Sequence, residues 1–402
     1  MYKGSLHLKI IKTGINKDQI SKKVTVKINN NYQVCTRCIM DTSDPNIFFN
    51  KDGVCNHCLR YDFLLSKRIY KGEEAKKALD NLIAEIKKAG KNKNYDCIIG
   101  VSGGIDSTYV AYLTKKLGLN PLAVHFDNGW NSELAVSNIE KTLERLNIDL
   151  YTYVIDWSMF KDLQISFLKS STPDGEIPTD HAINALLFRE ANKRGIKYIV
   201  NGMNFATESM AVEAWAYGHS DWKYIKNVHK LFGKERLKNY PRFNFYNLFF
   251  WTFIKRIRVV SILNYVEYIK EEAMSLLKHE LGWIYYGGKH YESVYTRFYQ
   301  GYYLPEKFNI DKRIGHYSDL VRSGQLNRPQ ALDDINKPMY DPSLLAQDKE
   351  FILKKLDFNQ ESFDEIIMGP NKSFKDYPNN YNVVNRIKRI VNYLREIGFY
   401  SK

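Results

Sequence analysis

A Ser/Gly-rich loop separates a predicted buried strand from a predicted helix near residue 100 of this 402-residue chain. The strand is Tyr95–Val101, the loop reads Ser102-Gly103-Gly104-Ile105-Asp106-Ser107, and the helix is Thr108–Leu117, which Gly118 ends. Adjacent glycines let a backbone turn its N–H groups inward, and the helix N-terminus adds partial positive charge. The segment therefore predicts a site for phosphate groups.

Three side chains of the loop have expected roles. The hydroxyls of Ser102 and Ser107 can donate hydrogen bonds to phosphate oxygens. Asp106 cannot bind a phosphate directly, so we expect it to hold Mg²⁺ or to order the loop. The alternative is a generic Gly-rich turn without a ligand, against which the two serines and the acid argue.

Strands and helices alternate from this loop to about residue 200. Hydrophobic periodicity predicts further strands at Leu122–Phe126, Tyr151–Ile155 and Tyr198–Val200, with helices at Ser132–Leu146 and Asp180–Arg194. Such alternation predicts an α/β fold with a doubly wound parallel sheet. Ligands bind outside the carboxyl ends of such strands, where polar clusters fall at 102–107, 125–131 and 201–208.

Four of the five cysteines form two CxxC pairs, Cys35/Cys38 and Cys55/Cys58. Four thiolates can converge tetrahedrally on Zn²⁺, and a site closed in this way is structural. The alternative is two disulfides, which are uncommon in the reducing compartment expected for a chain without a secretion signal. We interpret His57 as a surface residue and Cys97 as a packing residue of its strand.

These patterns divide the chain into four predicted parts. Residues 1–34 are an N-terminal extension without an assigned function, and 35–62 a zinc ribbon. Residues 63–214 are the α/β nucleotide domain, and 215–402 a mainly helical region that contributes phosphate-binding and substrate or partner surfaces. Its last predicted helix is basic and amphipathic and covers 385–400.

The chain carries a formal charge of +14. This surplus suits an anionic partner such as a nucleotide, a nucleotide sugar, nucleic acid or a membrane surface, although a solvated basic surface explains it as well. The most hydrophobic stretch, Phe243–Ile254, is too short to span a bilayer. We therefore expect a cytoplasmic protein that is not transmembrane and could lie peripherally on the inner membrane surface. For Phe243–Arg258 we favour a buried helix over an exposed face for a partner or membrane.

The loop resembles the SGGxDS motif of the PP-loop ATP pyrophosphatases, a class that includes asparagine, GMP and NAD synthetases and tRNA-thiolating enzymes. The G-x-x-x-x-G-K-[ST] motif of the P-loop NTPases is absent from the sequence. The resemblance implies that ATP, with Mg²⁺, is cleaved between its α and β phosphates while pyrophosphate occupies the loop, including Gly103 and Gly104.

From Cys35 onward the chain resembles the N-acetyl sugar amidotransferases of bacterial surface-polysaccharide synthesis, of the pseudaminic-acid and O-antigen type. The matching segments are Cys35–Thr42, His125–Asn131, Gly175–His181, Asn201–Glu208, Gly287–Ser293 and Arg297–Gln300. The resemblance implies that the N-acetyl group of a sugar, which we expect to be nucleotide-linked, becomes an acetamidino group. The amide oxygen attacks the α-phosphorus of ATP, and ammonia then displaces AMP from the O-adenylyl imidate.

Candidate site residues follow from these segments. Lys289, in a Gly-Gly-Lys-His turn, is expected to reach the phosphates with help from Arg297, unless both are solvated charges. Asp127 and Asn128 end the second strand, where the ribose and base should lie, although a simple turn is the alternative.

A second group has helix capping as its alternative role. Asn201, Asn204, Thr207 and Glu208 follow the fourth strand and could touch ATP or Mg²⁺. A helix near the expected sugar site begins with Glu176, Asp180 and His181, for which helix capping and catalysis are almost equally supported. His181 is the catalytic candidate among these three residues.

The source of nitrogen is a further expectation. Met1 and Tyr2 open the sequence without a cysteine nucleophile, and no Cys–His pair remains once the zinc site is filled. Ammonia must then come from solution or from a separate glutaminase. The resemblance implies a glutaminase with a cyclase-like subunit, similar to that of imidazole glycerol phosphate synthase.

Two rival interpretations remain. A PP-loop tRNA-thiolating enzyme would also carry CxxC motifs, and a net charge of +14 would suit binding to tRNA. Sulfur transfer often needs further cysteines, however, and only Cys97 remains outside the two CxxC pairs. We therefore do not expect tRNA or DNA as partners. A non-catalytic zinc-ribbon nucleotide-binding module is the other rival, against which the intact loop and Lys289 argue.

Overall fold

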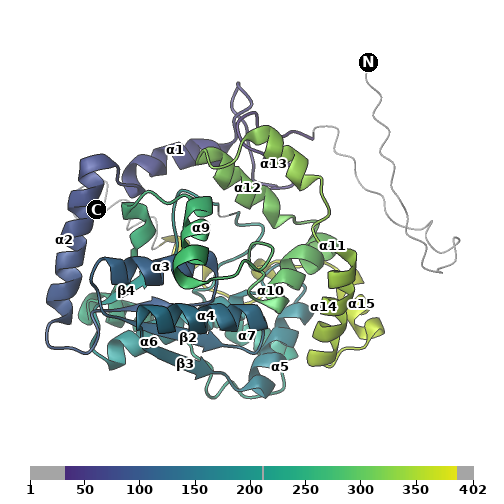
Figure 1. The fold of residues 1–402 in the computed structure, drawn as a ribbon. Helices are drawn as coiled ribbons and strands as arrows, with labels where there is room; N and C mark the ends of the chain where they lie inside the picture. Colours follow the sequence, from purple (N-terminus) through teal and green to yellow (C-terminus); the bar gives the residue numbers. More distant parts are fainter. Residues whose placement is uncertain (1–31, 211, 387–402) are drawn as a thin grey trace, which may run out of the picture. The chain divides into compact units, whose positions relative to one another are not determined.

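A five-stranded parallel sheet organises the structure (Figure 1), a computed structural model that describes residues 32–210 and 212–386. The strands lie in the order β3-β2-β1-β4-β5. Their bounds are β1 Cys97–Gly100, β2 Pro121–Asp127, β3 Leu150–Val154, β4 Tyr198–Asn201 and β5 Arg258–Ser261. Most of the predicted N-terminal extension (1–34) and of the predicted last helix (385–400) lies outside the described residues.

The parallel pairing of all five strands confirms the predicted fold class. The chain moves outward from β1 to β2 and β3, then returns to the other side of β1 with β4. Strand order therefore reverses at β1, which is where doubly wound sheets bind their ligands. The sequence did not indicate β5, which pairs with β4 from Tyr198 opposite Arg258. The sheet thus extends across the predicted boundary at residue 214.

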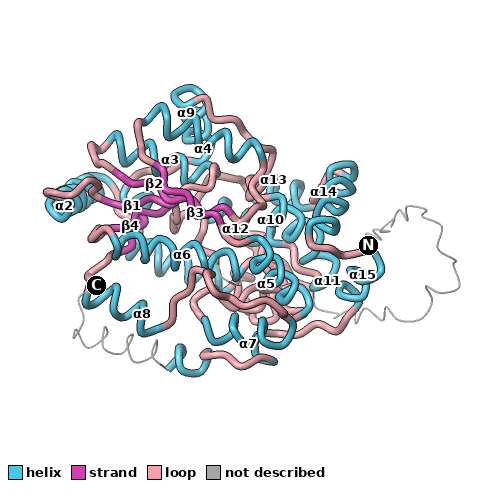
Figure 2. The backbone as a smooth tube through the Cα atoms, turned by 90° about the horizontal axis from the view of Figure 1, so that it is seen from below, coloured by secondary structure: helices cyan, strands magenta, loops and turns pink. Residues whose placement is uncertain are grey.

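Helices cover both faces of the sheet (Figure 2). On one face lie α2 (Gly72–Gly90), α3 (Ile105–Lys116), α4 (Glu133–Leu146) and α9 (Lys270–Leu281). On the other lie α5 (Trp157–Lys169) and α6 (Ile177–Lys193). Successive strand residues point to opposite faces, so Ile98 packs in one buried core and Ile99 in the other.

The predicted helical region after residue 215 is confirmed. Besides α9, its described helices are α7 Trp222–Phe232, α8 Phe245–Phe249, η2 Phe250–Ile254, η3 Ile262–Tyr265, α10 Val294–Phe298, η4 Tyr299–Tyr303, α11 Leu304–Phe308, α12 Lys312–Arg322, α13 Arg328–Ile335, α14 Pro342–Lys355, α15 Gln360–Met368 and η5 Phe374–Asp376. Before the sheet, α1 (Asn56–Arg68) follows the cysteine segment. No helix of the described residues is long and apolar enough to cross a membrane.

The apolar run at 243–258 has two sides. Trp251 is buried, and its ring stacks on Phe188 of α6 at a centroid distance of 5.3 Å. On the opposite side the aromatic rings of Phe249 and Phe253 are exposed. The predicted burial is therefore right for Trp251 and wrong for the outward side of the same segment.

The two sides should respond differently to truncation. We expect Trp251→Ala to lower the free energy of unfolding by about 3–5 kcal/mol, because it removes a buried aromatic side chain and leaves a cavity. Phe253→Ala, the matched control on the outward side, should change it by less than about 1 kcal/mol. Urea unfolding followed by circular dichroism measures both, and equal losses would contradict this division.

Candidate functional site

The Ser/Gly-rich loop lies at the carboxyl end of β1 and leads directly into α3, as predicted. Gly103 has a φ of 80°, and a Cβ there would clash with the carbonyl oxygen of Ala135 in α4. Only glycine satisfies both the dihedral angle and this close approach. The indole Nε1 of Trp283 donates to the carbonyl oxygen of Gly103 at 3.0 Å and holds the loop from the C-terminal side of the chain.

Hydroxyl groups bind the N–H groups of the loop. Gly104 N donates to Ser102 Oγ at 3.3 Å, and Ser102 N donates to Ser107 Oγ at 3.3 Å. Ile105 N, at the start of α3, donates to the hydroxyl of Tyr286 at 3.2 Å. Phosphate oxygens could replace these hydroxyls as acceptors for the backbone N–H groups, as in other anion sites at helix N-termini.

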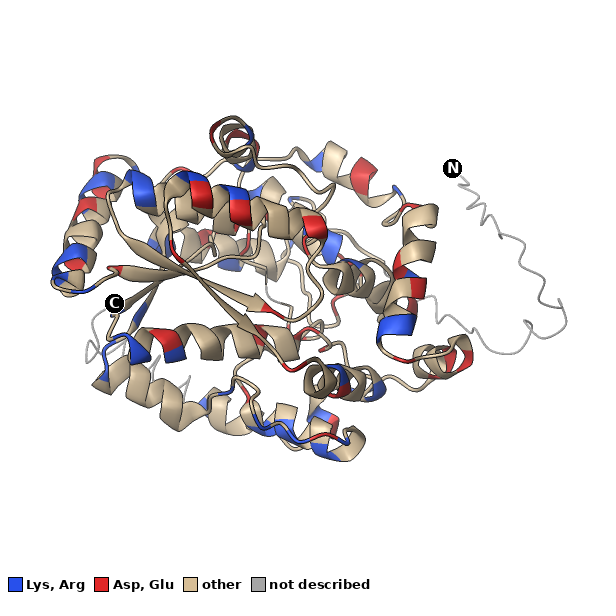
Figure 3. Ribbon diagram, turned by 60° about the horizontal axis from the view of Figure 1, so that its bottom comes forward, with Lys and Arg blue, Asp and Glu red and all other residues tan. Residues whose placement is uncertain are grey.

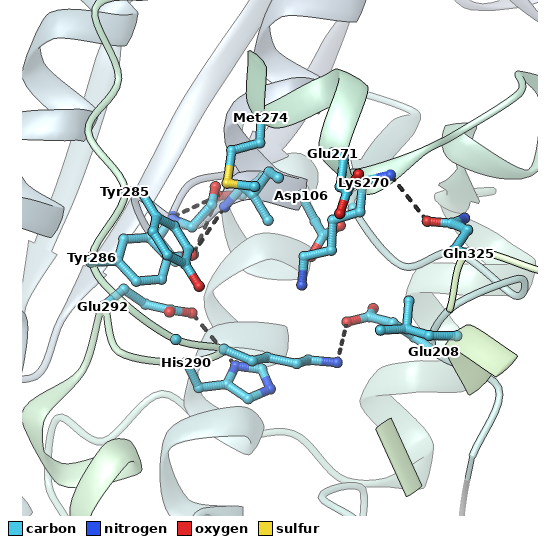
Figure 4. Close-up of a pocket in the computed structure, with 18 of the residues that line it drawn as sticks. Asp106, Glu208, Lys270, Glu271, Met274, Tyr285, Tyr286, His290, Glu292 and Gln325 are labelled. Atoms are coloured by element: carbon cyan, nitrogen blue, oxygen red, sulfur yellow. Dashed lines mark hydrogen bonds and ion pairs between the residues drawn. The ribbon is translucent and has the colours of Figure 1, made fainter. Parts of the chain in front are cut away.

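A cavity of about 520 Å³ adjoins the loop, and charged side chains from distant segments meet in it (Figure 4). Asp106 comes from α3, Glu208 from the segment after β4, and Lys270 from the start of α9. Lys289 completes the group, and its Nζ lies 3.1 Å from Glu208 Oε1. The hydroxyl of Tyr268 donates to Asp106 Oδ1 at 2.5 Å.

Burial and mutual repulsion set the charges of this group. Burial raises the pKa of the Asp106 carboxyl, and the nearby Glu208 raises it further. Burial lowers the pKa of the Lys270 ammonium, which Asp106 partly offsets. Two carboxylates that repel one another in a cavity form an oxygen donor set that fits Mg²⁺.

Backbone pairing holds the 287–293 segment over the end of the sheet. Ser132 N donates to the carbonyl oxygen of Glu292 at 2.8 Å, and Val294 N donates to that of Trp130 at 2.9 Å. Asn131 and Ser293 form an isolated antiparallel bridge between these hydrogen bonds. Two segments that the sequence separates by about 160 residues thus become neighbours, which carries Lys289 to the phosphate loop.

A second cavity, of about 530 Å³, shares Ser102, Gly202, His290 and Glu292 with the first. It lies between the carboxyl ends of the central strands and α6. Apolar side chains from the strands, from α6 and from the segment after β4 form one wall: Val124, Phe126, Leu187, Phe188 and Met203. An apolar wall beside a phosphate loop fits the base of a nucleotide.

Its far end is polar and continues into a third cavity of about 580 Å³ through Glu176, Asp180, Lys312 and His316. Gln300 Nε2 donates to both oxygens of Glu176 at 2.9 and 3.0 Å, and Lys312 Nζ donates to one at 3.0 Å. Burial raises the pKa of the Asp180 carboxyl, His219 opposes this and Glu176 adds to it. Asp180 therefore offers a carboxylate, poised to accept a proton, where the two cavities meet.

Most predicted loop residues and several others line these cavities. Ser102, Gly104, Asp106, Ser107, Glu208 and Lys289 line the first, and Asn128 and Asn201 line the second. Their roles toward ATP and Mg²⁺ stay predictions.

His181, the predicted catalytic candidate, lines none of the three cavities. Its Nδ1 lies 2.6 Å from the carbonyl oxygen of His219, and its Nε2 accepts from Phe243 N at 3.2 Å. The ring is fully buried and stacks on Phe243 at 4.4 Å between centroids, and burial lowers its pKa to about 4. Both ring nitrogens have backbone partners in the core, which favours a structural role, and the catalytic role stays a prediction.

Four other predicted residues bind neighbouring groups and line none of the three cavities, which favours the alternative role of each. Arg297 forms a bidentate ion pair with Asp348 at 2.7 and 2.8 Å. Asp127 Oδ1 accepts from Gly129 N at 2.9 Å, which is the turn alternative. Asn204 Oδ1 accepts from both the N–H and the hydroxyl of Thr207, which is the capping alternative for both residues.

Sequence reasoning missed Lys270, Tyr268 and Tyr286. Lys270 begins a helix and Tyr268 precedes it, and neither stands in a recognisable motif. Tyr286 directly precedes Gly287-Gly288-Lys289, so its position beside that turn was the one available signal.

The four cysteines of the predicted ribbon lie together and are free of disulfides. Cys35 Sγ lies 3.9 Å from Cys58 Sγ, and Cys38 Sγ lies 3.7 Å from Cys55 Sγ. Sulfurs on a tetrahedral zinc ion, with bonds of about 2.3 Å, are about 3.8 Å apart. The donor set and spacing therefore fit the predicted Zn²⁺, which would be closed to water and structural.

Contacts from the C-terminal region brace this zinc knuckle. Arg328 donates to the carbonyl oxygens of Cys38 and Cys35 at 2.9 and 2.8 Å. His57 is mostly buried, with Nε2 2.7 Å from Asp44 Oδ2, and is therefore not the surface residue predicted. None of the four cysteines lines the three cavities.

Comparisons with known families match two parts of the chain. Residues 74–223 match the NAD synthase family, and residues 292–390 match the family described as "LPS biosynthesis protein WbpG-like, C-terminal domain". The first match contains the phosphate loop and four strands, and the second begins at Glu292 beside the loop. The chain therefore joins a PP-loop domain to a WbpG-like C-terminal domain.

Individual relatives are partial or distant. A 7-cyano-7-deazaguanine synthase from Sulfurimonas denitrificans is 35% identical over 85 residues, which are 21% of this chain and 37% of that protein. An NMN synthetase from Francisella tularensis is 16% identical, and its structure gives a TM-score of 0.27. The alignment covers 47% of this chain and 99% of the synthetase chain. A glutamine-dependent NAD+ synthetase from Acinetobacter baumannii is 18% identical, and its structure gives a TM-score of 0.28. The alignment covers 40% of this chain and 33% of that synthetase chain.

The zinc knuckle gives a direct prediction. Purified protein should contain about one zinc per chain, and Cys55→Ser should lower both the zinc content and the thermal midpoint, because metal binding contributes to folding. Cys97→Ser, which changes a buried thiol outside the cluster, should keep the metal. Elemental analysis and thermal unfolding measure these effects; full zinc content in Cys55→Ser would contradict the assignment.

Proposed function

We propose that this chain, a WbpG-type member of the PP-loop family, converts the N-acetyl group of a sugar into an acetamidino group. The reaction consumes ATP and ammonia and releases AMP and pyrophosphate in surface-polysaccharide synthesis. The observation that carries the proposal is the continuity of three cavities, from the phosphate loop past an apolar wall to a polar chamber at Asp180. The loop cavity suits the phosphates, and the second cavity, which runs from Ser102 to Asp180, would take the nucleoside on its apolar wall and an acceptor on its polar side.

The chemistry explains why an acceptor must lie beside the nucleotide. The amide oxygen attacks the α-phosphorus, the bond to the β-phosphate oxygen breaks, and pyrophosphate leaves. Ammonia then adds to the imidate carbon, one proton is lost, and AMP departs with the former amide oxygen. The product is a cationic amidinium, so the site must hold the reactants close and stabilise charge that changes sign along the path.

Lys289 and Lys270 supply positive charge at the phosphate end. Both line the loop cavity, and Lys289 is held by its ion pair with Glu208. Bound Mg²⁺, held by Asp106 and Glu208, would neutralise phosphate charge. The N–H groups of the loop and of the α3 N-terminus would stabilise the leaving pyrophosphate.

Asp180 suits the acceptor end. A carboxylate favours a developing cation, and a raised pKa makes it a stronger base for the proton that adding ammonia releases. Glu176 is already bound by Gln300 and Lys312, so we assign it to positioning. The acceptor would be an N-acetyl sugar, for which we favour a nucleotide-linked form.

Ammonia would come from a separate glutaminase with a cyclase-like subunit. No cysteine lines the three cavities in the described part of the chain. The same fact weighs against sulfur transfer, since Cys97 is buried in β1. The lysines and carboxylates at the loop weigh against a module without catalysis.

The decisive experiment supplies ATP, Mg²⁺, labelled ammonium and a panel of UDP- and CMP-linked N-acetyl sugars. Mass spectrometry should show an amidine that carries the label, formed in equal amount to AMP. Absence of AMP with every acceptor on the panel would count against the proposal, and AMP formed with tRNA instead would favour the rival enzyme.

Two substitutions separate the phosphate site from its supports. Lys289→Met should lower the kcat of AMP formation by about 100-fold or more, because it removes a charge that faces the leaving group, while thermal stability stays unchanged. Arg297→Met should instead lower the thermal midpoint, because it leaves the buried Asp348 carboxylate without its cationic partner. Steady-state rates and thermal melts of both variants, with Lys76→Met as a surface control, test this. A large loss of kcat in Arg297→Met without a change in thermal midpoint would instead support the predicted role of Arg297 at the phosphates.

The nitrogen source should show in the pH profile. Alone, the chain should use ammonium salts but not glutamine, and its rate should rise towards about pH 9 as ammonium loses its proton. With the glutaminase present, glutamine should support turnover and the profile should flatten. AMP release with each nitrogen source measures this; glutamine-dependent turnover by the single chain would contradict the two-component arrangement.

A further inference from the structure

The helical segment formed by α8 and η2 carries an apolar stripe that nothing in the described structure covers. Tyr246, Phe249, Phe250, Phe253 and Ile254 recur at helical spacing and expose between 41% and 84% of their surface. We name these five residues the aromatic stripe. Trp251 anchors the opposite side of the same segment against α6, and Figure 2 shows α8 outside α6. The stripe therefore faces away from the sheet.

The exposure of these apolar side chains to water is unfavourable, and this indicates a function for the stripe. Single exposed apolar residues are ordinary, but contiguous exposed patches mark interaction sites. The segment already buries Trp251, so the outward aromatic residues add nothing to the core. None of the five lines the three cavities. The stripe is thus a projecting surface and not a groove that receives a ligand or a peptide.

Charge identifies the kind of partner. Figure 3 shows acidic and basic residues mixed along most of the ribbon. Around the stripe the sequence differs, because residues 236–266 contain six Lys or Arg and no Asp or Glu. Lys255 and Arg256 follow the stripe directly and are exposed. One of the six, Arg258, is paired with Glu85.

An aromatic stripe followed by basic residues matches the chemistry of a membrane interface. Aromatic rings enter the boundary between headgroups and acyl chains, and lysine and arginine attract anionic headgroups. A protein partner would need an acidic apolar surface, whereas an anionic bilayer supplies both properties without further features. We propose that the aromatic stripe, with Lys255 and Arg256, docks this protein peripherally on anionic phospholipid membranes.

Vesicle co-sedimentation tests the proposal with the full-length protein. The wild type should bind vesicles of phosphatidylcholine that contain ~30 mol% phosphatidylglycerol, because this anionic lipid gives the vesicles a negative surface. Pure phosphatidylcholine vesicles should bind it about tenfold less, and 0.5 M salt, at roughly a 4 Å screening length, should release most of it. Failure of the wild type to bind the anionic vesicles would overturn the proposal.

Matched variants assign the binding to the stripe. Phe249→Gln/Phe253→Gln should lower the partition coefficient about tenfold or more, because two rings no longer leave water. Phe63→Gln/Met368→Gln, which changes two exposed apolar residues elsewhere, should bind as the wild type does. Lys255→Gln/Arg256→Gln should weaken binding and reduce its salt dependence, whereas Lys76→Gln/Lys77→Gln on α2 should not.

The variants also separate a membrane from a protein partner. Because the changed side chains are exposed, thermal midpoints should match the wild type. Equal vesicle binding by the stripe variant and its control would overturn the proposal. So would a wild type that ignores vesicles but self-associates through the stripe in light scattering, an outcome that assigns the surface to a second copy of the chain.

Discussion

Two backbone hydrogen bonds join the two halves of the site, and the rest of its geometry depends on them. Ser132 N to Glu292 O and Val294 N to Trp130 O fasten the 287–293 segment to the chain that follows β2. Without this pairing Lys289 would have no fixed relation to the phosphate loop. The hydrogen bond from Trp283 to Gly103 strengthens the same junction. Backbone pairing is suited to this task because neighbouring hydrogen bonds fix position and direction together.

The zinc knuckle extends this bracing to the acceptor end. Arg328 of α13 binds two carbonyl groups of the knuckle, and Ser318 of α12 accepts a hydrogen bond from Ile39. The same α12 supplies Lys312 and His316 to the polar chamber. A metal site that faces no cavity can therefore influence the chemistry by holding the helix that supplies these side chains.

Whether a polar residue acts on a ligand or supports the fold follows from whether its bonding capacity is already used. Arg297 forms a bidentate ion pair with Asp348, and both ring nitrogens of His181 bind backbone groups. Lys289 forms an ion pair with Glu208 and also lines the loop cavity, and Asp180 lines two cavities. The same reasoning applies to apolar groups: within the described residues the aromatic stripe stays largely exposed, whereas Trp251 behind it is buried.

Local patterns in the sequence were enough for the parallel sheet, the phosphate loop and the cysteine cluster. Each depends on residues within a few positions of one another, where hydrophobic period, glycine conformation and ligand spacing act directly. The sequence did not predict β5, the position of Lys270 in the loop cavity or the core partners of His181. Each of these depends on residues more than 35 positions away along the chain. Nor could it separate the two sides of the 243–258 run, since a helix with apolar residues all round looks buried until packing shows which side meets α6. Tertiary structure decided these points, because only the folded chain shows which polar groups have found partners and which still face a cavity.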